Sequence, residues 1–442
     1  MNSKIEPIIR YIFSLLLGGE GWEGKIAYAR RVDETALITI QASDFFDEGI
    51  YLTERSLPSL PLVQWHGIPL LFGESKEEMI DGHMIIHADI IASSYFLISR
   101  YEELVTTGNR DSHGRFMGRG SLLGRAGFLE RPVIDEYGKV LRDILRRIGF
   151  DIGRTKRAGK VYLTHDVDIP WKKWGFISAL RNCAGYTRQE RRPVLWPLRN
   201  FLGDYSCNPF DTFECIFELD TMAKKSLGDR CKDIYFVIAA CKPDSYTENY
   251  IRDKKAEAFI ERLKRQTDHI GLHISYEGGK TSDEELIRKE KRLLESKLKR
   301  EVRINRNHYL LTKTPASFRS LISIGISDDY TMGYADRVGF RLGTAQCVRW
   351  IDAENVRLTE LHLHPLIIMD SSFAEEQYMG LKKQEAIEKI REIYRKCQIV
   401  DGDFSVLFHN SMFMPGPYFW VGDVYQDLIN MLIEEKRTME II

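Results

Sequence analysis

The spacing of hydrophobic residues predicts a change of architecture part-way along the chain. Near the start, apolar positions from Ile5 to Leu16 recur at helical intervals and Gly18 follows them, which predicts an amphipathic helix. Residues 25–72 then alternate short apolar stretches with turn residues and prolines, a pattern typical of strands joined by loops. Helical periodicity returns at residues 90–104 and 133–148. We therefore expect the first part of the chain to form a small α+β domain.

After a polar, basic stretch at residues 151–160, short β-rich runs alternate with longer helical segments. The runs lie at residues 161–163, 234–240, 270–274, 302–304, 323–326 and 404–408. A repeated strand-then-helix order predicts parallel strands with helical crossovers, hence a doubly wound sheet or a barrel. We expect an α/β protein with an N-terminal α+β domain at residues 1–155 and a (β/α) domain at residues 156–442. Residues 171–209 are too long for a plain connection and predict a lid or insertion.

Composition narrows the function classes. The 442 residues include 63 Lys and Arg against 64 Asp and Glu, a formal net charge of -1, which argues against a general nucleic-acid binder. The 7 cysteines include no C-x-x-C pair, so we expect reduced thiols in a cytoplasmic protein. The apolar run at residues 11–17 follows the acidic Glu6 and has no A-x-A site after it, which is unlike a secretory leader. No apolar run approaches the roughly 20 residues that span a bilayer.

Chemically capable side chains follow directly after the apolar runs of the second domain. These clusters are Thr-His-Asp-Val-Asp at 164–168, His-Ile-Ser-Tyr-Glu at 273–277, Arg-Asn-His-Tyr at 306–309, Asp-Asp at 328–329 and His-Asn at 409–410. In (β/α) barrels the active site gathers at the carboxyl ends of the strands. We therefore expect the clusters to converge, and we expect some of their members to contact substrate. These substrate candidates are His165, His308, Tyr309 and Asp329.

Asp166 and Asp168 are the first candidates for chemistry. Residues i and i+2 of an extended segment face the same way, so the two carboxylates can serve as a metal ligand plus a general base or as a carboxylate pair. His273 ends a strand, where a neutral imidazole is a natural ligand for zinc or a similar ion. Glu277 is within reach if the loop turns helically, whereas a strand would place His269 roughly 13 Å from His273. The remaining ligand is open among Glu277, His308 and His269.

Two further residues suit proton transfer and charge stabilisation. Arg306 carries a permanently charged, forked guanidinium that can orient a carboxylate. His409 has an imidazole that titrates near neutrality and can deliver a proton to a leaving group. The chain has no G-x-S-x-G elbow, Walker loop, G-x-G-x-x-G after a strand or H-E-x-x-H. The sequence therefore lacks the usual signatures of α/β serine hydrolases, P-loop NTPases, Rossmann dehydrogenases and zincins.

The order of these clusters resembles the polysaccharide deacetylase superfamily, also known as the NodB-homology or carbohydrate esterase family 4 group. Its motifs T-F-D-D, H-[ST]-x-x-H, R-x-P-Y, a fourth containing Asp, and L-x-H follow in the same order. A bacterial branch is more similar, with LTHDVD, GLH-x-S-Y, R-x-HYL, GFR-x-GT and a late HNS. These stand here at residues 163–168, 271–276, 306–310, 339–344 and 409–411. That branch also has an N-terminal domain of unknown function, whose SRYEE and HGRF elements look like residues 99–103 and 113–116.

The resemblance implies a distorted (β/α) barrel of the NodB type and a hydrolase that acts on a non-peptide C–N bond. It implies that the substrate is a carbohydrate or related N-acylated amide, and that a divalent metal ion, zinc in particular, assists the reaction. By position, Asp166 matches the catalytic base, His409 the general acid and Arg306 the arginine that tunes the base. The implied metal ligands are Asp168, His273 and Glu277, with His308 as the alternative to Glu277.

Two other functions remain open at this point. A glycoside hydrolase would pair Asp166 or Asp168 with Asp329, at about 5.5 Å or about 6.5–9.5 Å between carboxyl groups, and would need no metal. A catalytically inactive barrel would bind carbohydrate or a protein partner without turnover. The sequence alone gives neither the substrate and acyl group nor the role of residues 1–155.

Overall fold

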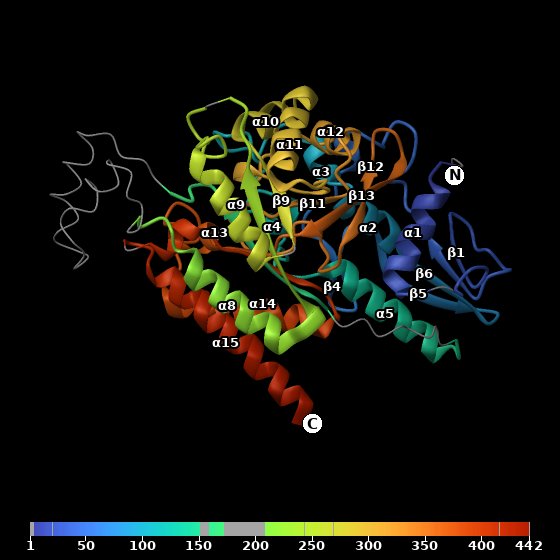
Figure 1. Cartoon of the computed structure of the whole chain (residues 1–442). Coiled ribbons are helices and arrows are strands. Elements are labelled where there is room, and N and C mark those ends of the chain that lie inside the picture. The colour runs from blue at the N-terminus through green and yellow to red at the C-terminus, as the bar shows by residue number, and fades with distance from the viewer. Residues whose placement is uncertain are drawn as a thin grey trace.

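The computed structural model describes residues 4–19, 21–150, 159–171, 208–242, 244–267, 269–414 and 416–441 (Figure 1). The expected domain boundary at residue 155 and most of the insertion expected at residues 171–209 lie outside these ranges. None of the helices in these ranges combines the length and the apolar character that a membrane span requires.

The first part of the chain combines helices with a small sheet, as its pattern predicted. Helix α1 (Glu6–Leu17) ends at Gly18, which adopts the left-handed conformation that glycine favours at a helix end. The four-stranded sheet has the order β1-β2-β6-β5, and β3 pairs with β4 in a separate hairpin. The strands are β1 (Ile26–Ala29), β2 (Ile38–Gln41), β3 (Val63–Trp65), β4 (Ile68–Leu70), β5 (Gly73–Ile80) and β6 (His83–Ala88). The helices that follow are α2 (Ile90–Ile98), α3 (Tyr101–Val105), α4 (Leu122–Arg125) and α5 (Val133–Arg147).

The second part is built on a curled nine-stranded sheet with the order β12-β13-β11-β10-β9-β8-β7-β15-β14 (Figure 1). Its strands are β7 (Val161–Val167), β8 (Cys231–Ile238), β9 (Ile270–Ile274), β10 (Ile304–Asn307), β11 (Asp328–Met332), β12 (Val348–Asp352), β13 (Arg357–Pro365), β14 (Ile368–Met369) and β15 (Phe404–Leu407). All neighbours are parallel except β12 and β13. The mixed α/β class expected from the sequence is confirmed.

Helices cover the sheet and connect its strands. They are α8 (Phe213–Leu227), α9 (Lys254–Gln266), α10 (Tyr276–Thr281), α11 (Glu284–Leu298), α12 (Ala316–Ser323), α13 (Asp370–Ala374), α14 (Lys383–Ile399) and α15 (Trp420–Ile441). Figure 1 shows α8, α14 and α15 together on one side of the molecule, away from the small N-terminal sheet.

One predicted strand was wrong. The run at residues 323–326 is not a strand, because it contains the last residue of α12 and the turn that follows. Gly325 lies in this turn with a φ of +79°, a conformation that ends a helix and interrupts an extended segment. The strand itself, β11, begins only at Asp328.

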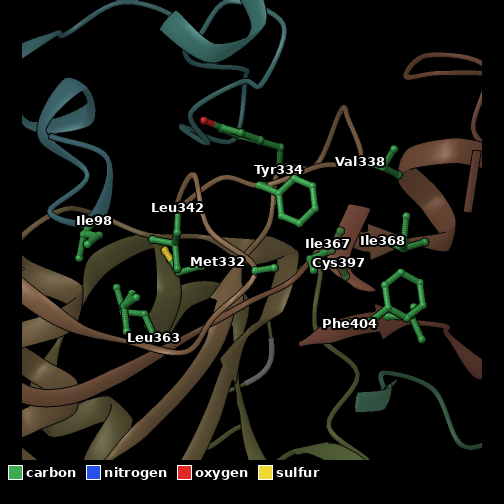
Figure 2. Packing of buried hydrophobic residues seen from close by; sticks show 14 of the residues in the cluster. Ile98, Met332, Tyr334, Val338, Leu342, Leu363, Ile367, Ile368, Cys397 and Phe404 are labelled. Carbon is green, nitrogen blue, oxygen red and sulfur yellow. The ribbon is translucent and has the colours of Figure 1, made fainter. Parts of the chain in front are cut away.

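Both parts of the chain contribute to one hydrophobic core. Figure 2 shows Ile98 of α2 close to Leu342 and Leu363, and all three belong to the same cluster of buried residues. Contact is close near Gly343, where an added Cβ would lie 2.5 Å from a carbon of Leu97, and near Gly339, where it would lie 2.3 Å from a carbon of Leu129. The backbone also crosses between the parts, since the Phe340 N–H donates to Leu129 at 2.8 Å and the Ile134 N–H to Gly343 at 3.0 Å. The N-terminal region is therefore packed against the segment that follows β11.

Candidate functional site

The carboxyl ends of β7, β9, β10 and β15 bring most of the predicted site residues together. These strands lie close to one another in the sheet, with only β8 between β7 and β9. Since parallel strands end at the same edge, the side chains at and just after their ends meet there. The residues brought together are Asp166, Asp168, His273, Arg306, His308 and His409.

Asp168, His273 and His308 form a group that we call the ligand triad. Each offers one ligand atom within 4.8 Å of the others. Asp168 Oδ1 lies 3.2 Å from Nε2 of His273, and its Oδ2 lies 3.6 Å from Nε2 of His308. Two imidazole nitrogens and one carboxylate oxygen make a donor set that suits zinc and similar divalent cations.

Hydrogen bonding supports this assignment. His273 Nδ1 lies 2.9 Å from the backbone oxygen of Arg306, which fixes Nδ1 as the donor and turns Nε2 toward the triad. Nε2 of His273 and Oδ1 of Asp168 are buried and lie 3.2 Å apart, but they are not aligned for a hydrogen bond with each other, and within the described part of the chain neither has another hydrogen-bond partner. Buried polar atoms are normally satisfied, so a cation that accepts both lone pairs fits the residues present.

Electrostatics in the triad favour a positive charge near the carboxylate. Burial lowers the pKa of His273, but Asp166 and Asp168 outweigh it and hold that pKa above its ordinary value. Burial raises the pKa of Asp168, yet His308 and His273 outweigh it and leave that pKa well below its usual range. The triad thus attracts either protons or a cation to the same place.

Asp166 is held by Arg306 next to the triad. Its Oδ1 accepts a hydrogen bond from Arg306 Nη1 at 2.9 Å, and both side chains are buried. Arg306 Nε donates to the backbone oxygen of Tyr330 at 3.0 Å, and the guanidinium lies 4.4 Å from the ring centroid of Phe236. Asp166 Oδ2 lies 3.5 Å from His273 Nε2. Arg306 therefore fixes one carboxylate oxygen and leaves the other facing the triad.

His409 is oriented by Asp370, a residue that the sequence reasoning missed. His409 Nδ1 lies 2.7 Å from Asp370 Oδ1, and the His409 backbone N–H donates to Asp370 Oδ2 at 2.6 Å. The other ring nitrogen, Nε2, lies 3.8 Å from Asp168 Oδ2 and 4.0 Å from Asp166 Oδ2. Burial lowers the pKa of His409, but Asp370 outweighs it and the pKa rises to about 10. His409 is therefore protonated at neutral pH with Nε2–H directed at the site.

Three residues that the sequence predicts for the site lie outside it. His165 is on the opposite face of β7 from Asp166, because alternate strand residues point to opposite faces, and its Nε2 lies 3.2 Å from Asp220 Oδ2 in the interior. Asp329 is completely buried and accepts hydrogen bonds from Asn305 and Thr331, so it does not line the cavity. Glu277 lies in the first turn of α10 and is not a member of the ligand triad.

The site opens into a cavity of about 560 Å³. Its lining includes Asp166, Asp168 and His409, together with His308 and Tyr309 from the segment after β10. The predicted substrate contacts at His308 and Tyr309 are thus placed on the cavity, whereas His165 and Asp329 are not. The glycoside-hydrolase alternative therefore lacks Asp329 as a cavity-facing partner.

Comparisons with known proteins give two findings. Residues 3–149 match a family model described as a family of unknown function, DUF7033. Among solved structures, the chain is similar to the crystal structure of a "putative polysaccharide deacetylase from Mycobacterium smegmatis", with 13% identity and a TM-score of 0.37. That similarity covers 65% of this chain and 92% of the other. No curated protein matches the chain.

Proposed function

We propose that this protein is a metal-assisted hydrolase that removes an N-acyl group from a carbohydrate or a related amide. The observation that carries the proposal is the meeting of three units on one cavity: the ligand triad, the Asp166–Arg306 pair and the His409–Asp370 pair. Together they supply a cation site, a proton acceptor and a proton donor. The motif order that resembles polysaccharide deacetylases supports the same chemistry. Zinc as the cation, a barrel of the NodB type and a cytoplasmic, bacterial setting belong to this proposal.

Each of the three units has a separate role in the proposed reaction. A divalent cation bound to the ligand triad would polarise the amide carbonyl and acidify a water molecule. Asp166, held by Arg306, would accept a proton from the water molecule whose oxygen attacks the carbonyl carbon. His409, protonated and oriented by Asp370, donates a proton to the amide nitrogen as the C–N bond breaks. The products are a free amine and a carboxylic acid.

The proposal is tested by metal content and acetate release measured on the same preparations. Untagged wild-type protein should hold near-stoichiometric zinc and release acetate from a panel of N-acetylated amino sugars and their oligomers. His273→Ala should lose both the metal and the activity. Asp166→Asn should retain the metal and lose at least about 100-fold in kcat, the size typical of general-base catalysis.

His362→Ala is the matched control, because His362 is a β13 histidine that does not line the cavity. It should retain both metal and activity. Wild-type protein that stays empty after incubation with zinc, cobalt or nickel would reject the metal mechanism. Protein that holds metal but hydrolyses no N-acyl sugar would instead favour a non-catalytic binding barrel.

A further inference from the structure

One wall of the catalytic cavity comes from the N-terminal region. We call residues 109–119 the wall segment. The cavity residues that it contributes are Asp111, Ser112, His113, Arg115, Met117 and Arg119. The remaining lining comes from the second part of the chain, including Tyr309 and Tyr378. The cavity is therefore shared between the region that matches the family of unknown function and the sheet that carries the chemistry.

The wall segment is held in one shape by its own hydrogen bonds. Asp111 Oδ1 accepts the backbone N–H groups of His113 at 3.0 Å and Arg115 at 2.9 Å, and Asn109 Nδ2 donates to the Met117 backbone oxygen at 2.8 Å. Asp336, after β11, accepts the N–H groups of Gly118 at 2.6 Å and Arg119 at 3.1 Å. The segment is thus tied both to itself and to the second part of the chain.

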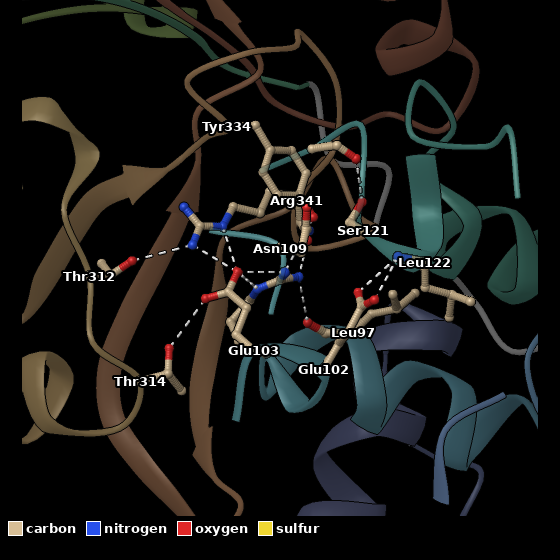
Figure 3. A network of polar contacts seen from close by, with 12 residues as sticks. Leu97, Glu102, Glu103, Asn109, Ser121, Leu122, Thr312, Thr314, Tyr334 and Arg341 are labelled. Atoms are coloured by element: carbon tan, nitrogen blue, oxygen red, sulfur yellow. Dashed lines mark hydrogen bonds and ion pairs between the residues drawn. The ribbon is translucent and has the colours of Figure 1, made fainter. Parts of the chain in front are cut away.

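The residues on either side of the wall segment are anchored as well (Figure 3). On the side of α3, the Glu103 carboxylate lies between the guanidinium groups of Arg100 and Arg341, each at 2.7 Å. On the side of α4, Glu102 accepts the backbone N–H of Leu122 at 2.8 Å. Because both flanks are fixed, the wall segment presents its side chains to the cavity as a preformed surface.

Arg115 joins the wall segment to two tyrosines of the opposite region. Its guanidinium lies 5.6 Å from the ring centroid of Tyr309 and 5.9 Å from that of Tyr378, and Nη2 donates to the Tyr378 hydroxyl at 2.8 Å. Asp111 balances its charge, with Oδ2 2.7 Å from Arg115 Nε. The Arg115 side chain is only 10% exposed. A guanidinium held this way fixes the planes of both rings.

Tyr309 also needs such support. It has a φ of +60°, and Leu310 has a φ of +54°, a left-handed conformation that is costly for residues with side chains. Strained backbone of this kind persists at functional sites only when its surroundings hold it. The ring of Tyr309 packs against Arg115, and the strained turn directly follows His308 of the ligand triad.

We propose that the wall segment is the substrate-recognition element of the site and that Arg115 is its positioning residue. Arg115 holds Tyr309 and Tyr378 so that a sugar ring next to the scissile amide binds between these aromatic side chains and the polar groups of the wall. Small-ligand sites combine aromatic surface with a few placed polar groups in this way. The inference rests on the proposed function for its substrate class, and it assigns the N-terminal region to substrate binding.

The test separates binding from chemistry. Arg115→Gln removes the charge, and Tyr378→Leu removes one ring, which provides a second variant if the first does not fold. Kinetics use N-acetylglucosamine and its trimer as probes, and calorimetric Kd values are measured in an Asp166→Asn background so that the probes are not consumed. We expect KM and Kd to rise at least about tenfold while kcat changes less than about threefold and zinc content is unchanged.

Arg131→Gln is the control, since Arg131 belongs to the same region and pairs with Glu136 but does not line the cavity. It should leave KM, Kd and zinc content at wild-type values. KM and Kd within about twofold of wild type in folded Arg115→Gln and Tyr378→Leu would overturn the inference. Loss of zinc in Arg115→Gln would also overturn it, because Arg115 would then support the ligand triad. Wild-type protein that neither binds nor hydrolyses the probes would instead reject the substrate class in the proposed function.

Discussion

Glu103→Gln tests how strongly the two parts of the chain depend on each other. Glu103 is 2% exposed and accepts hydrogen bonds from Arg100 and Arg341, so its carboxylate joins α3 to the segment after β11 (Figure 3). Burial raises the pKa of Glu103, but the two arginines outweigh it and lower the pKa from 4.5 to about 2. That difference corresponds to about 3 kcal/mol of folding free energy at neutral pH. This value agrees with the cost of about 3–5 kcal/mol that is typical when one partner of a buried ion pair is removed and the opposite charge is left unbalanced.

The pH dependence follows from the sign of the shift. A lowered folded-state pKa means that the unfolded chain binds the proton more tightly, so the stabilisation is complete above pH 4.5 and is lost as pH falls through 2. In urea denaturation followed by circular dichroism, Glu103→Gln should reduce the free energy of unfolding by about 3 kcal/mol at pH 7 and by roughly half as much at pH 3.

Glu136→Gln is the matched control for this substitution. It removes the partner of Arg131 in a pair that is 34% and 23% exposed, and it should cost less than about 1 kcal/mol. A deficit below about 1 kcal/mol at pH 7 in Glu103→Gln, or one that does not shrink at pH 3, would refute the reasoning.

Three further predictions concern the second part of the chain. Burial raises the pKa of Glu290 to about 7, so wild-type protein loses stability as pH rises from 4.5 to 7. Compared with wild type, Glu290→Gln should be up to about 3 kcal/mol more stable at pH 8.5 and no more stable at pH 4.5. Equal shifts in melting temperature at both pH values would contradict this prediction. His308→Ala should weaken zinc binding at least about tenfold in equilibrium dialysis, and unchanged affinity would remove His308 from the ligand triad. Asp370→Asn should lower the pKa of His409 from about 10, so kcat/KM should fall more steeply as pH rises above 7, and an unchanged pH profile would argue against His409 as the proton donor.

The sequence predicts that the site residues converge, because a single rule about parallel strands places them. Polar residues after buried parallel strands meet at one edge, and this rule brings Asp166, Asp168, His273 and His409 together. A second rule, that alternate strand residues point to opposite faces, explains why His165 does not join them. His165 is next to Asp166 on β7 and faces the other side of the sheet. Strand pattern thus predicts which edge and which face a residue occupies.

The hydrophobic pattern does not predict the conformation of the turns that follow the strands. A helical turn after β9 predicts Glu277 near His273. Helix α10 does begin at Tyr276, but Glu277 does not enter the ligand triad. His308 enters it instead, from a segment whose next residue, Tyr309, has left-handed backbone that no apolar periodicity signals. Asp370 was missed because β14 contains only 2 residues. The available signal was its position directly after the apolar residues 366–369.

The sequence does not predict that the N-terminal region lines the cavity. Motif order predicts the site within residues 164–409, yet the wall segment also lines the cavity beside these residues. The contacts that place the wall segment are long-range, between Asp336 and the N–H groups of Gly118 and Arg119, and between Arg115 and Tyr378. Such contacts leave no local periodicity in the chain. A protein that lacked residues 1–150 would therefore lose one wall of its cavity as well as the side of the hydrophobic core that packs near Leu342, so substrate binding and folding should fail together.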